Sequence, residues 1–278
     1  MLTTDDHRRD SAGLRYVYPV VSRRAGGVSI GINLNVNNAC NWACLYCQVY
    51  DLTRGGPPPI DLDRLESELA GFLQDAIHGD FMQRAVPMEA RRMMDIAFSG
   101  NGEPTSAPEF AEAVGRVAKV MQDFGLVGQL PVRLITNGSL LHRPEVVEGI
   151  RLIGELAGEV WFKLDRARAA EILEINGVPL LPEKAVANLA CCSALAPTWV
   201  QTCWFALDGK EPDASARAAY CALLAPLAGQ LAGIHLYGLA RPSLQPAAGR
   251  LSRLPAERLM CFAEEVKEKT GIRVLVSP

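Results

Sequence analysis

A short loop early in the chain holds three cysteines, and it constrains the rest of the sequence more than any other feature. Cys40, Cys44 and Cys47 follow the spacing Cys-x-x-x-Cys-x-x-Cys. Thiolates this close together can converge on one metal centre, either zinc or an iron–sulfur cluster. A structural zinc needs a fourth protein ligand, and the nearest downstream histidine is His78, beyond a run of three prolines. A four-iron cluster on three thiolates keeps one iron open for a small molecule, so the loop predicts an enzyme.

With the aromatic Tyr46 directly before the third cysteine, the loop resembles the signature of the radical S-adenosylmethionine (radical SAM) superfamily. In that family the open iron binds the amino and carboxylate groups of SAM, and an electron from the cluster cleaves SAM to a 5′-deoxyadenosyl radical. The resemblance implies a 4Fe-4S cluster on the three cysteines, SAM with its adenine near Tyr46, and an external reductant such as flavodoxin or ferredoxin.

A second motif follows the next apolar run, with the sequence Gly100-Asn101-Gly102-Glu103-Pro104. On its own it reads as a turn. After a cysteine triplet it resembles the Gly-Gly-Glu motif of radical SAM enzymes, whose backbone and acid hold the SAM ammonium. The glycines would let the backbone approach closely, and Pro104 would keep Glu103 extended. Polar residues also end the third and fourth strands, where the family binds the SAM carboxylate and ribose, and these are Asn137, Ser139 and Asp165.

Lys163 stands within the apolar run Trp161-Phe-Lys-Leu-Asp165. Burial lowers the pKa of a lysine, which would make this amine a nucleophile or a ligand for an anion. The alternative is a lysine that extends to solvent or pairs with Asp165. We take Lys163 as the candidate catalytic residue.

Strand-like runs alternate with amphipathic helical segments along the chain, which is typical of parallel βαβ units. The sequence predicts an α/β fold, a partial (β/α)6 TIM-like barrel in one domain over residues 1–278. An N-terminal β-hairpin arm would occupy residues 1–28, and a helix-strand extension residues 241–278. Such sheets carry their sites at the carboxyl ends of the strands. The six predicted strands are residues 29–36, 94–99, 132–136, 160–164, 198–207 and 233–237.

Composition and charge indicate which partners and which cellular compartment to expect. A net charge of −3 and a pI near 5.9 give no general attraction to nucleic acid. No run of about 18 apolar residues is present, the first residues are polar, and the eight cysteines suit a reducing compartment, so we expect a cytoplasmic protein without membrane association. The other five cysteines show no repeated ligand spacing.

Three segments together resemble the radical SAM branch that includes the tRNA wyosine-synthesis enzymes, and they are residues 44–49, 98–104 and 134–139. Those enzymes use a lysine to form a Schiff base with a keto acid and carry cysteines for a second cluster, and this chain has no comparable second set. We therefore expect a small-molecule substrate. The alternatives are radical modification of a tRNA base, a non-catalytic iron–sulfur electron carrier, and a zinc-binding module.

Overall fold

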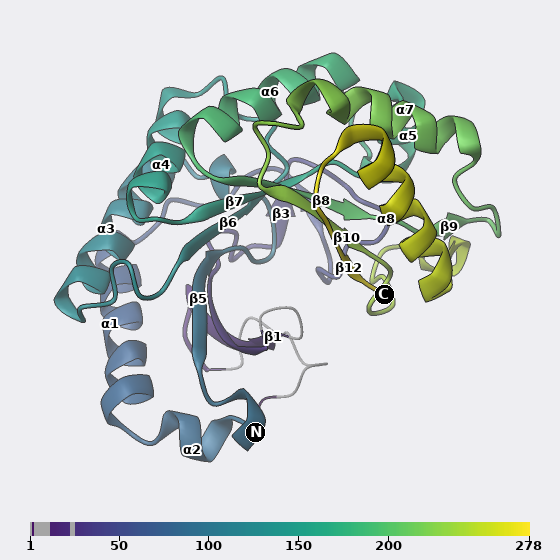
Figure 1. Cartoon of the computed structure of the whole chain (residues 1–278). Helices are drawn as coiled ribbons and strands as arrows, with labels where there is room; N and C mark the ends of the chain where they lie inside the picture. Colours follow the sequence, from purple (N-terminus) through teal and green to yellow (C-terminus); the bar gives the residue numbers. More distant parts are fainter. Residues whose placement is uncertain (1, 3–11, 23–25) are drawn as a thin grey trace.

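The computed structural model describes residues 2, 12–22 and 26–278, which form a strongly curved sheet with helices along its outer side (Figure 1). The main sheet has eight strands in the order β1-β2-β5-β6-β7-β8-β10-β12. β1 is antiparallel to β2, and every other neighbouring pair in this sheet is parallel. The sheet curls into a half-barrel, so the expected α/β partial TIM-like barrel is confirmed.

The eight strands of the main sheet are Val17–Ser22 (β1), Gly27–Ile32 (β2), Met93–Phe98 (β5), Val132–Thr136 (β6), Glu159–Lys163 (β7), Thr198–Cys203 (β8), Gly233–Tyr237 (β10) and Val274–Ser277 (β12). Two pairs of short strands lie apart from it, Ala39–Cys40 (β3) with Thr53–Arg54 (β4), and Ala206–Leu207 (β9) with Leu251–Ser252 (β11).

The helices of the described chain are Leu62–His78 (α1), Phe81–Ala85 (α2), Phe110–Asp123 (α3), Pro144–Glu155 (α4), Ala169–Asn176 (α5), Pro182–Leu195 (α6), Ala214–Leu224 (α7) and Ala256–Thr270 (α8). Short 3₁₀ turns occupy Met88–Ala90, Pro104–Ser106, Ala225–Leu227 and Ala248–Arg250.

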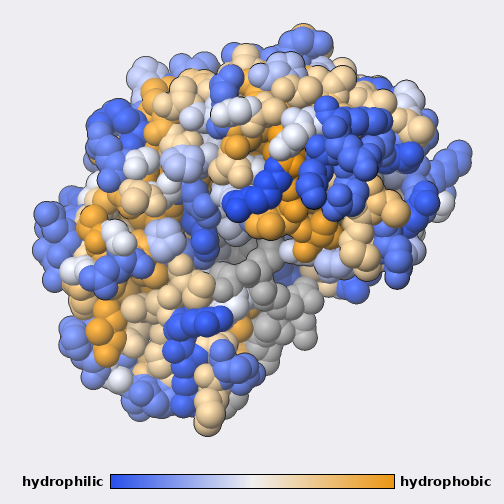
Figure 2. Space-filling model, in the orientation of Figure 1, coloured by the Kyte–Doolittle hydropathy of each residue, from blue (hydrophilic) through white to orange (hydrophobic). Residues whose placement is uncertain are grey.

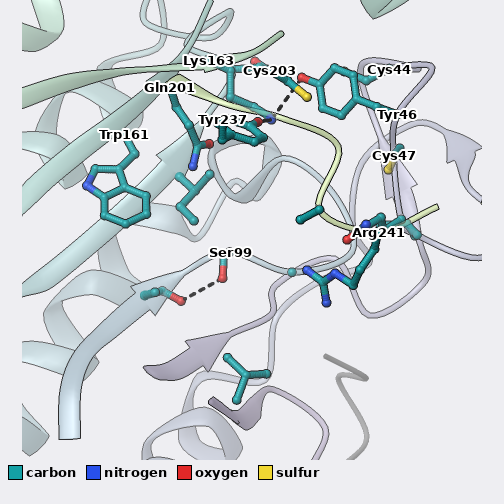
Figure 3. Close-up of a pocket in the computed structure, with 18 of the residues that line it drawn as sticks. Cys44, Tyr46, Cys47, Ser99, Trp161, Lys163, Gln201, Cys203, Tyr237 and Arg241 are labelled. Atoms are coloured by element: carbon teal, nitrogen blue, oxygen red, sulfur yellow. Dashed lines mark hydrogen bonds between the residues drawn. The ribbon is translucent and has the colours of Figure 1, made fainter. Parts of the chain in front are cut away.

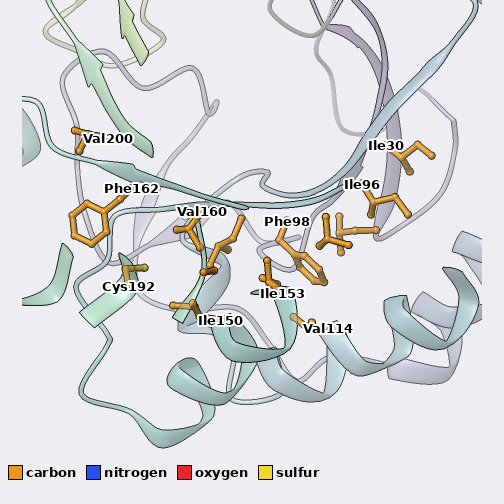
Figure 4. Packing of buried hydrophobic residues seen from close by; sticks show 14 of the residues in the cluster. Ile30, Ile96, Phe98, Val114, Ile150, Ile153, Val160, Phe162, Cys192 and Val200 are labelled. Carbon is orange, nitrogen blue, oxygen red and sulfur yellow. The ribbon is translucent and has the colours of Figure 1, made fainter. Parts of the chain in front are cut away.

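The convex face of the sheet is apolar because the helices cover it. Side chains alternate between the two faces of a strand, so every second residue packs against a helix. Phe98 of β5 meets Phe110 of α3 edge to face, with ring centres 5.8 Å apart. Gly149 of α4 makes room for this pair, since a Cβ there would lie 2.4 Å from the Phe110 ring. Figure 4 shows this layer, in which Ile30, Ile96 and Val160 from three strands lie against helix side chains.

The concave face carries polar side chains at the alternate positions. Five neighbouring strands contribute Ser29, Asp95, Arg133, Lys163 and Gln201 to a cavity on this side. Figure 2 shows hydrophilic residues interspersed with apolar ones over the outer helices. The half-barrel therefore separates an apolar outer core from a polar inner wall.

Four details differ from the expected element map. The first parallel strand ends at Ile32, so Asn33 and Asn35 are buried in the following loop and not on a strand. The strand expected at residues 198–207 breaks after Cys203, and its last part pairs with β11. Helix α5 was not predicted. The strand of the C-terminal extension joins the main sheet as its seventh parallel strand.

The N-terminal hairpin is confirmed where β1 pairs with β2 in antiparallel register. The second arm of this hairpin is also the first strand of the half-barrel, because β2 pairs with β5 in parallel. Residues 1, 3–11 and 23–25 of the expected arm lie outside the described residues.

In the part of the chain that the structure describes, none of the helices combines the length and the apolar character needed to cross a membrane.

Candidate functional site

The three cysteines lie in the loop that follows β2, and all three line a cavity of about 560 Å³ on the concave side of the half-barrel. The loop has its own hydrogen bonds. The Cys47 amide donates to the Cys44 carbonyl at 3.1 Å, and the Gly55 amide donates to the Cys40 carbonyl at 3.0 Å. The site thus stands at the carboxyl ends of the strands, where the sequence analysis placed it.

Helix α5 holds the part of the loop around Cys44. The backbone N–H groups of Ala43 and Leu45 donate to the carbonyls of Asn176 and Ile175, at 3.0 and 2.8 Å. These carbonyls belong to the last turn of α5, which has no partners for them within the helix. The Asn176 side chain adds a bond from its Nδ2 to the Cys44 Sγ at 3.3 Å.

The segment after β10 holds the loop from the other side. The Ser243 hydroxyl donates to the Leu45 carbonyl at 2.6 Å, and the Leu244 amide donates to the Cys47 carbonyl at 3.0 Å. Gln245 donates from its Nε2 to the Val49 carbonyl at 2.8 Å. Two segments that are remote in sequence therefore fix the conformation of the cysteine loop.

The chemistry of the three thiols fits an iron–sulfur cluster. Burial raises the pKa of Cys40 to about 11 and that of Cys44 to about 12, so both thiols hold their protons until a metal displaces them. Within the described residues, no three His, Cys, Asp or Glu side chains are arranged to hold a single metal ion. A four-iron cluster attaches each cysteine to a different iron, and such ligands lie farther apart than those of one ion.

The two glycines of the second motif pack against the loop that precedes Cys40. Gly100 has a φ of 145°, and a Cβ there would lie 2.3 Å from the Asn33 Oδ1. A Cβ on Gly102 would lie 2.1 Å from the Ala39 carbonyl oxygen. Asn33 also accepts a hydrogen bond from the Asn101 amide at 3.0 Å. The close backbone approach expected from these glycines is present, and its partner is the cysteine loop.

The Glu103 carboxylate is buried among four protein donors. It accepts hydrogen bonds from the Thr105 amide and hydroxyl at 3.2 and 2.6 Å, from the Thr136 hydroxyl at 2.6 Å, and from the Asn137 amide at 2.7 Å. A carboxylate offers about four acceptor sites. Burial raises the pKa of Glu103, although these donors oppose the shift. Glu103 lines the cavity and connects the second and third strand ends.

Asn137 and Ser139 form a closed ring of hydrogen bonds with Asn41 of the cysteine loop. Asn137 donates from its Nδ2 to the Asn41 Oδ1 at 2.8 Å, and Asn41 donates from its Nδ2 to the Ser139 Oγ at 2.8 Å. The Ser139 hydroxyl donates to the Asn137 Oδ1 at 2.7 Å. Through this ring the third strand end is tied to the residue directly after Cys40.

Tyr46, Asp165 and Lys163 form a second network on the opposite side of the loop. The Tyr46 hydroxyl donates to the Asp165 carboxylate and accepts from the Lys163 Nζ at 3.2 Å. Asp165 also accepts from the Asn176 Nδ2 at 2.8 Å and from the Cys203 amide at 2.8 Å. Asn176 therefore links the Cys44 thiol to the network that contains Tyr46 and Lys163.

Lys163 points into the cavity (Figure 3). Its Nζ also lies 3.3 Å from the Tyr237 hydroxyl, and the charge lies over the Tyr46 ring, 4.9 Å from its centre. Burial lowers the pKa of Lys163, but the neighbouring acidic groups of Tyr237, Asp165 and Cys44 together outweigh burial and raise this pKa above its usual range. The expected direction of the shift is wrong, and the protonated side chain is suited to an anion ligand.

The cavity brings most of the predicted site residues together. Its lining includes the three cysteines, Tyr46, Gly100, Gly102, Glu103, Asn137 and Lys163. Asn101, Ser139 and Asp165 do not line it. Ser139 and Asp165 bond to the lining residues Asn137 and Tyr46, whereas Asn101 bonds to Asn33 and Asn38 of the loop before Cys40. Sequence reasoning missed Asn41 and Asn176. Asn41 lies between two of the cysteines, and this position was the one signal that could have marked it.

Three curated proteins match part of the sequence, and two of them illustrate the match. The GTPase Obg of Brachyspira hyodysenteriae is 29% identical over 129 residues, which are 46% of this chain and 16% of that protein. The UPF0026 protein slr1464 of Synechocystis sp. is 26% identical over 161 residues, which are 58% of this chain and 52% of that protein. The chain thus spans about half the length of the second relative and much less of the first. No protein-family model matches the chain.

Solved structures give a wider match. The structure of TYW1 with a lysine-pyruvate adduct bound is 16% identical, covers 88% of this chain and 74% of its own, and has a TM-score of 0.59. A radical SAM methyltransferase from Sphaerobacter thermophilus is 15% identical, covers 94% of this chain and 68% of its own, and has a TM-score of 0.60. At these identities the likeness shows the fold alone: the chain has the fold seen in TYW1 and in a radical SAM methyltransferase, which agrees with the resemblance seen in the sequence.

Proposed function

We propose that this chain is a cytoplasmic radical SAM enzyme that acts on a small-molecule substrate. The observation that carries this proposal is the position of three cysteines of one loop on the wall of one cavity, at the carboxyl ends of the strands of a radical SAM fold. Cys40, Cys44 and Cys47 would hold a 4Fe-4S cluster. When bound, the cluster and SAM supply the electron and the 5′-deoxyadenosyl group that start radical chemistry, and an external reductant such as flavodoxin or ferredoxin would recharge the cluster.

The residues of the chain prepare the site for these groups. Asn176 donates a hydrogen bond to the Cys44 sulfur, and hydrogen bonds to cluster sulfurs affect the reduction potential. Asp165 orients the Tyr46 ring, which the family resemblance places near the adenine of SAM. Glu103 and Asn137 present polar atoms to the same cavity and would take the amino and carboxylate groups of SAM, with Gly100 and Gly102 beside them.

The size of the cavity supports a small substrate. About 560 Å³ falls within the range of small-molecule and cofactor pockets. Lys163 and Gln201 lie on its wall and are available to a second molecule.

One experiment separates this proposal from the alternatives. The protein is reconstituted anaerobically with iron and sulfide, given SAM and dithionite, and assayed for 5′-deoxyadenosine. We expect a brown protein that releases 5′-deoxyadenosine, and a Cys40→Ala variant that does neither. A colourless zinc protein or a coloured protein that leaves SAM intact would refute the proposal.

A further inference from the structure

Gln201 is a buried polar residue whose side chain has no hydrogen-bond partner among the described residues. It is only 2% exposed and lines the cavity, and Figure 3 shows its amide directed into the cavity from β8. Among the described residues no side chain or backbone group makes a hydrogen bond with this amide. An amide has two donor hydrogens and a carbonyl acceptor, and here they face the cavity. They are therefore available to a ligand.

Lys163 is the neighbour of Gln201 across two parallel strands. The two residues are register partners in β7 and β8, so their side chains leave the sheet on the same face. The Lys163 ammonium has three donor hydrogens, and Tyr46 and Tyr237 accept two of them. Within the described part of the chain, no carboxylate lies at ion-pair distance from this ammonium. The Asp165 carboxylate acts on this charge only through the Tyr46 hydroxyl and through space, so the third ammonium hydrogen is left for an acceptor such as an anionic ligand.

The acids that line the same cavity are already engaged. The Asp95 carboxylate is paired with Arg133 and accepts from the Ser29 hydroxyl. Glu103 receives the four hydrogen bonds described above. Neither of these two acids lies at ion-pair distance from Lys163.

The wall beside the two polar side chains is apolar. Trp161 precedes Lys163 by two residues on the same face of β7, and Ile135, Ala97 and Val20 line the cavity from other strands. A ligand here can bury an apolar body against this wall while its anionic end meets Gln201 and Lys163.

We propose that Lys163 and Gln201 form a subsite for the carboxylate of a small-molecule substrate with an apolar body. One carboxylate oxygen would accept the third ammonium hydrogen of Lys163, and the other would accept an N–H of the Gln201 amide. The inference rests on the proposed function, because it assigns the cavity to a substrate. SAM also carries a carboxylate. In the proposed function the SAM carboxylate goes to the side of the cavity that carries Glu103 and Asn137, which favours the substrate as the source of the carboxylate at Lys163 and Gln201.

The test measures binding of phenylacetate to the reconstituted protein with SAM present, by saturation-transfer NMR. Phenylacetamide has the same shape without the charge and is the matched ligand control. We expect the amide to bind at least about tenfold more weakly than phenylacetate. Gln201→Leu should weaken phenylacetate binding about tenfold, and Gln201→Glu should weaken it further through like-charge repulsion. Val200→Ala changes the opposite face of the same strand and should leave binding unchanged.

Three results would overturn the subsite. The first is that phenylacetate fails to bind at 10-fold molar excess over about 1 mM protein. The second is that phenylacetamide binds as tightly as phenylacetate. The third is that the Gln201→Leu variant binds phenylacetate as tightly as the parent protein. If SAM displaces phenylacetate, the subsite binds the carboxylate of SAM, and its assignment to a substrate is wrong. The release of 5′-deoxyadenosine by the same sample tests the proposed function separately. The subsite and the proposed function can therefore fail independently.

Discussion

Two regions of one cavity differ in how their polar groups are used. The cluster rim comprises the cysteine loop and the residues that hold it, which are Asn41, Glu103, Asn137, Ser139, Asp165 and Asn176. Each of these six side chains makes hydrogen bonds to other parts of the protein. The cavity wall comprises Trp161, Lys163 and Gln201, and there the Gln201 amide and one hydrogen of the Lys163 ammonium have no partner among the described residues.

The difference indicates that the cluster rim serves the cofactor and the cavity wall serves the substrate. A cofactor site needs ligands that are held in place before binding, because a network of satisfied hydrogen bonds fixes side-chain orientation. A substrate site needs polar atoms that are still available, because only these give binding energy when the ligand arrives. Tyr46 connects the two regions, since its hydroxyl donates to Asp165 and accepts from Lys163.

The largest effect is expected from the rim cysteines. Replacement of Cys40, Cys44 or Cys47 by Ala should abolish the cluster and all SAM cleavage, because each thiolate is one of three protein ligands in the proposed site. Iron and sulfide content, the reduced-cluster EPR signal and 5′-deoxyadenosine release measure the loss. The exposed Cys191 is the control, since Cys191→Ala should behave as the parent. A normal EPR signal in any of the three loop variants would remove that cysteine from the ligand set.

Glu103→Gln should lower the free energy of unfolding by about 1–3 kcal/mol. An amide cannot accept all four hydrogen bonds, and it turns its own NH2 toward N–H donors. Urea unfolding followed by circular dichroism measures the change. Glu89, which lies in an exposed turn, provides the control variant Glu89→Gln. An unchanged midpoint would show that the bonds to Glu103 contribute nothing net.

The pH dependence of stability is a second test of the contribution of Glu103 to folding. Its pKa in the folded protein is raised by burial above the ordinary 4.5, so the unfolded chain releases this proton first as the pH rises. The contribution of Glu103 to stability is therefore full below pH 4.5 and is lost as the pH rises through the folded pKa. Glu103→Gln should flatten this part of the stability profile. A profile that keeps its slope would assign the slope to other groups, such as Asp95, whose pKa burial also raises.

The sequence predicted the half-barrel and the cavity because both depend on local patterns. Apolar runs that alternate with amphipathic helices define βαβ units, and the cysteine spacing defines the loop at the strand ends. The residues that support the loop were not predictable in the same way. Asn176 acts on Cys44 across 132 positions of sequence, and Ser243 acts on Leu45 across 198. Such contacts exist only once the fold is formed.

The pKa of Lys163 shows why charge at a site is harder to predict than position. The sequence showed a lysine in an apolar strand, and burial alone would lower its pKa. The opposing effect comes from Tyr237 on another strand and from Asp165 and Cys44, whose proximity depends on tertiary structure. Position follows from strand alternation, but the sign of a pKa shift follows from the sum of all neighbours.

Tyr46→Phe removes the hydroxyl that links the cluster rim to the cavity wall and keeps the ring against Phe205. We expect it to lower the free energy of unfolding by about 1 kcal/mol, a smaller effect than that of Glu103→Gln. Urea unfolding of Tyr46→Phe, Lys163→Met and the double variant gives the coupling between the two side chains. We expect about 0.5 kcal/mol or more of coupling, as for residues in one hydrogen-bond network. Tyr16→Phe is the control, at a buried tyrosine whose hydroxyl accepts a hydrogen bond from the Asp61 amide. Strict additivity would mean that the two regions are independent.

The smallest effect is expected at Asn176, and it is a change of potential and not of cluster content. The Asn176 Nδ2 donates to Cys44, and a donor to a cluster sulfur stabilises the reduced, more negative state. Asn176→Leu should therefore make the cluster harder to reduce, by up to about tenfold in the reduction equilibrium, which is about 59 mV for one electron. An EPR-monitored redox titration measures the shift, with iron content as a check on assembly. Leu173→Ala, at an exposed position of the same helix, should keep the potential of the parent. An equal potential in Asn176→Leu would mean that this asparagine supports the fold of the rim without acting on the cluster.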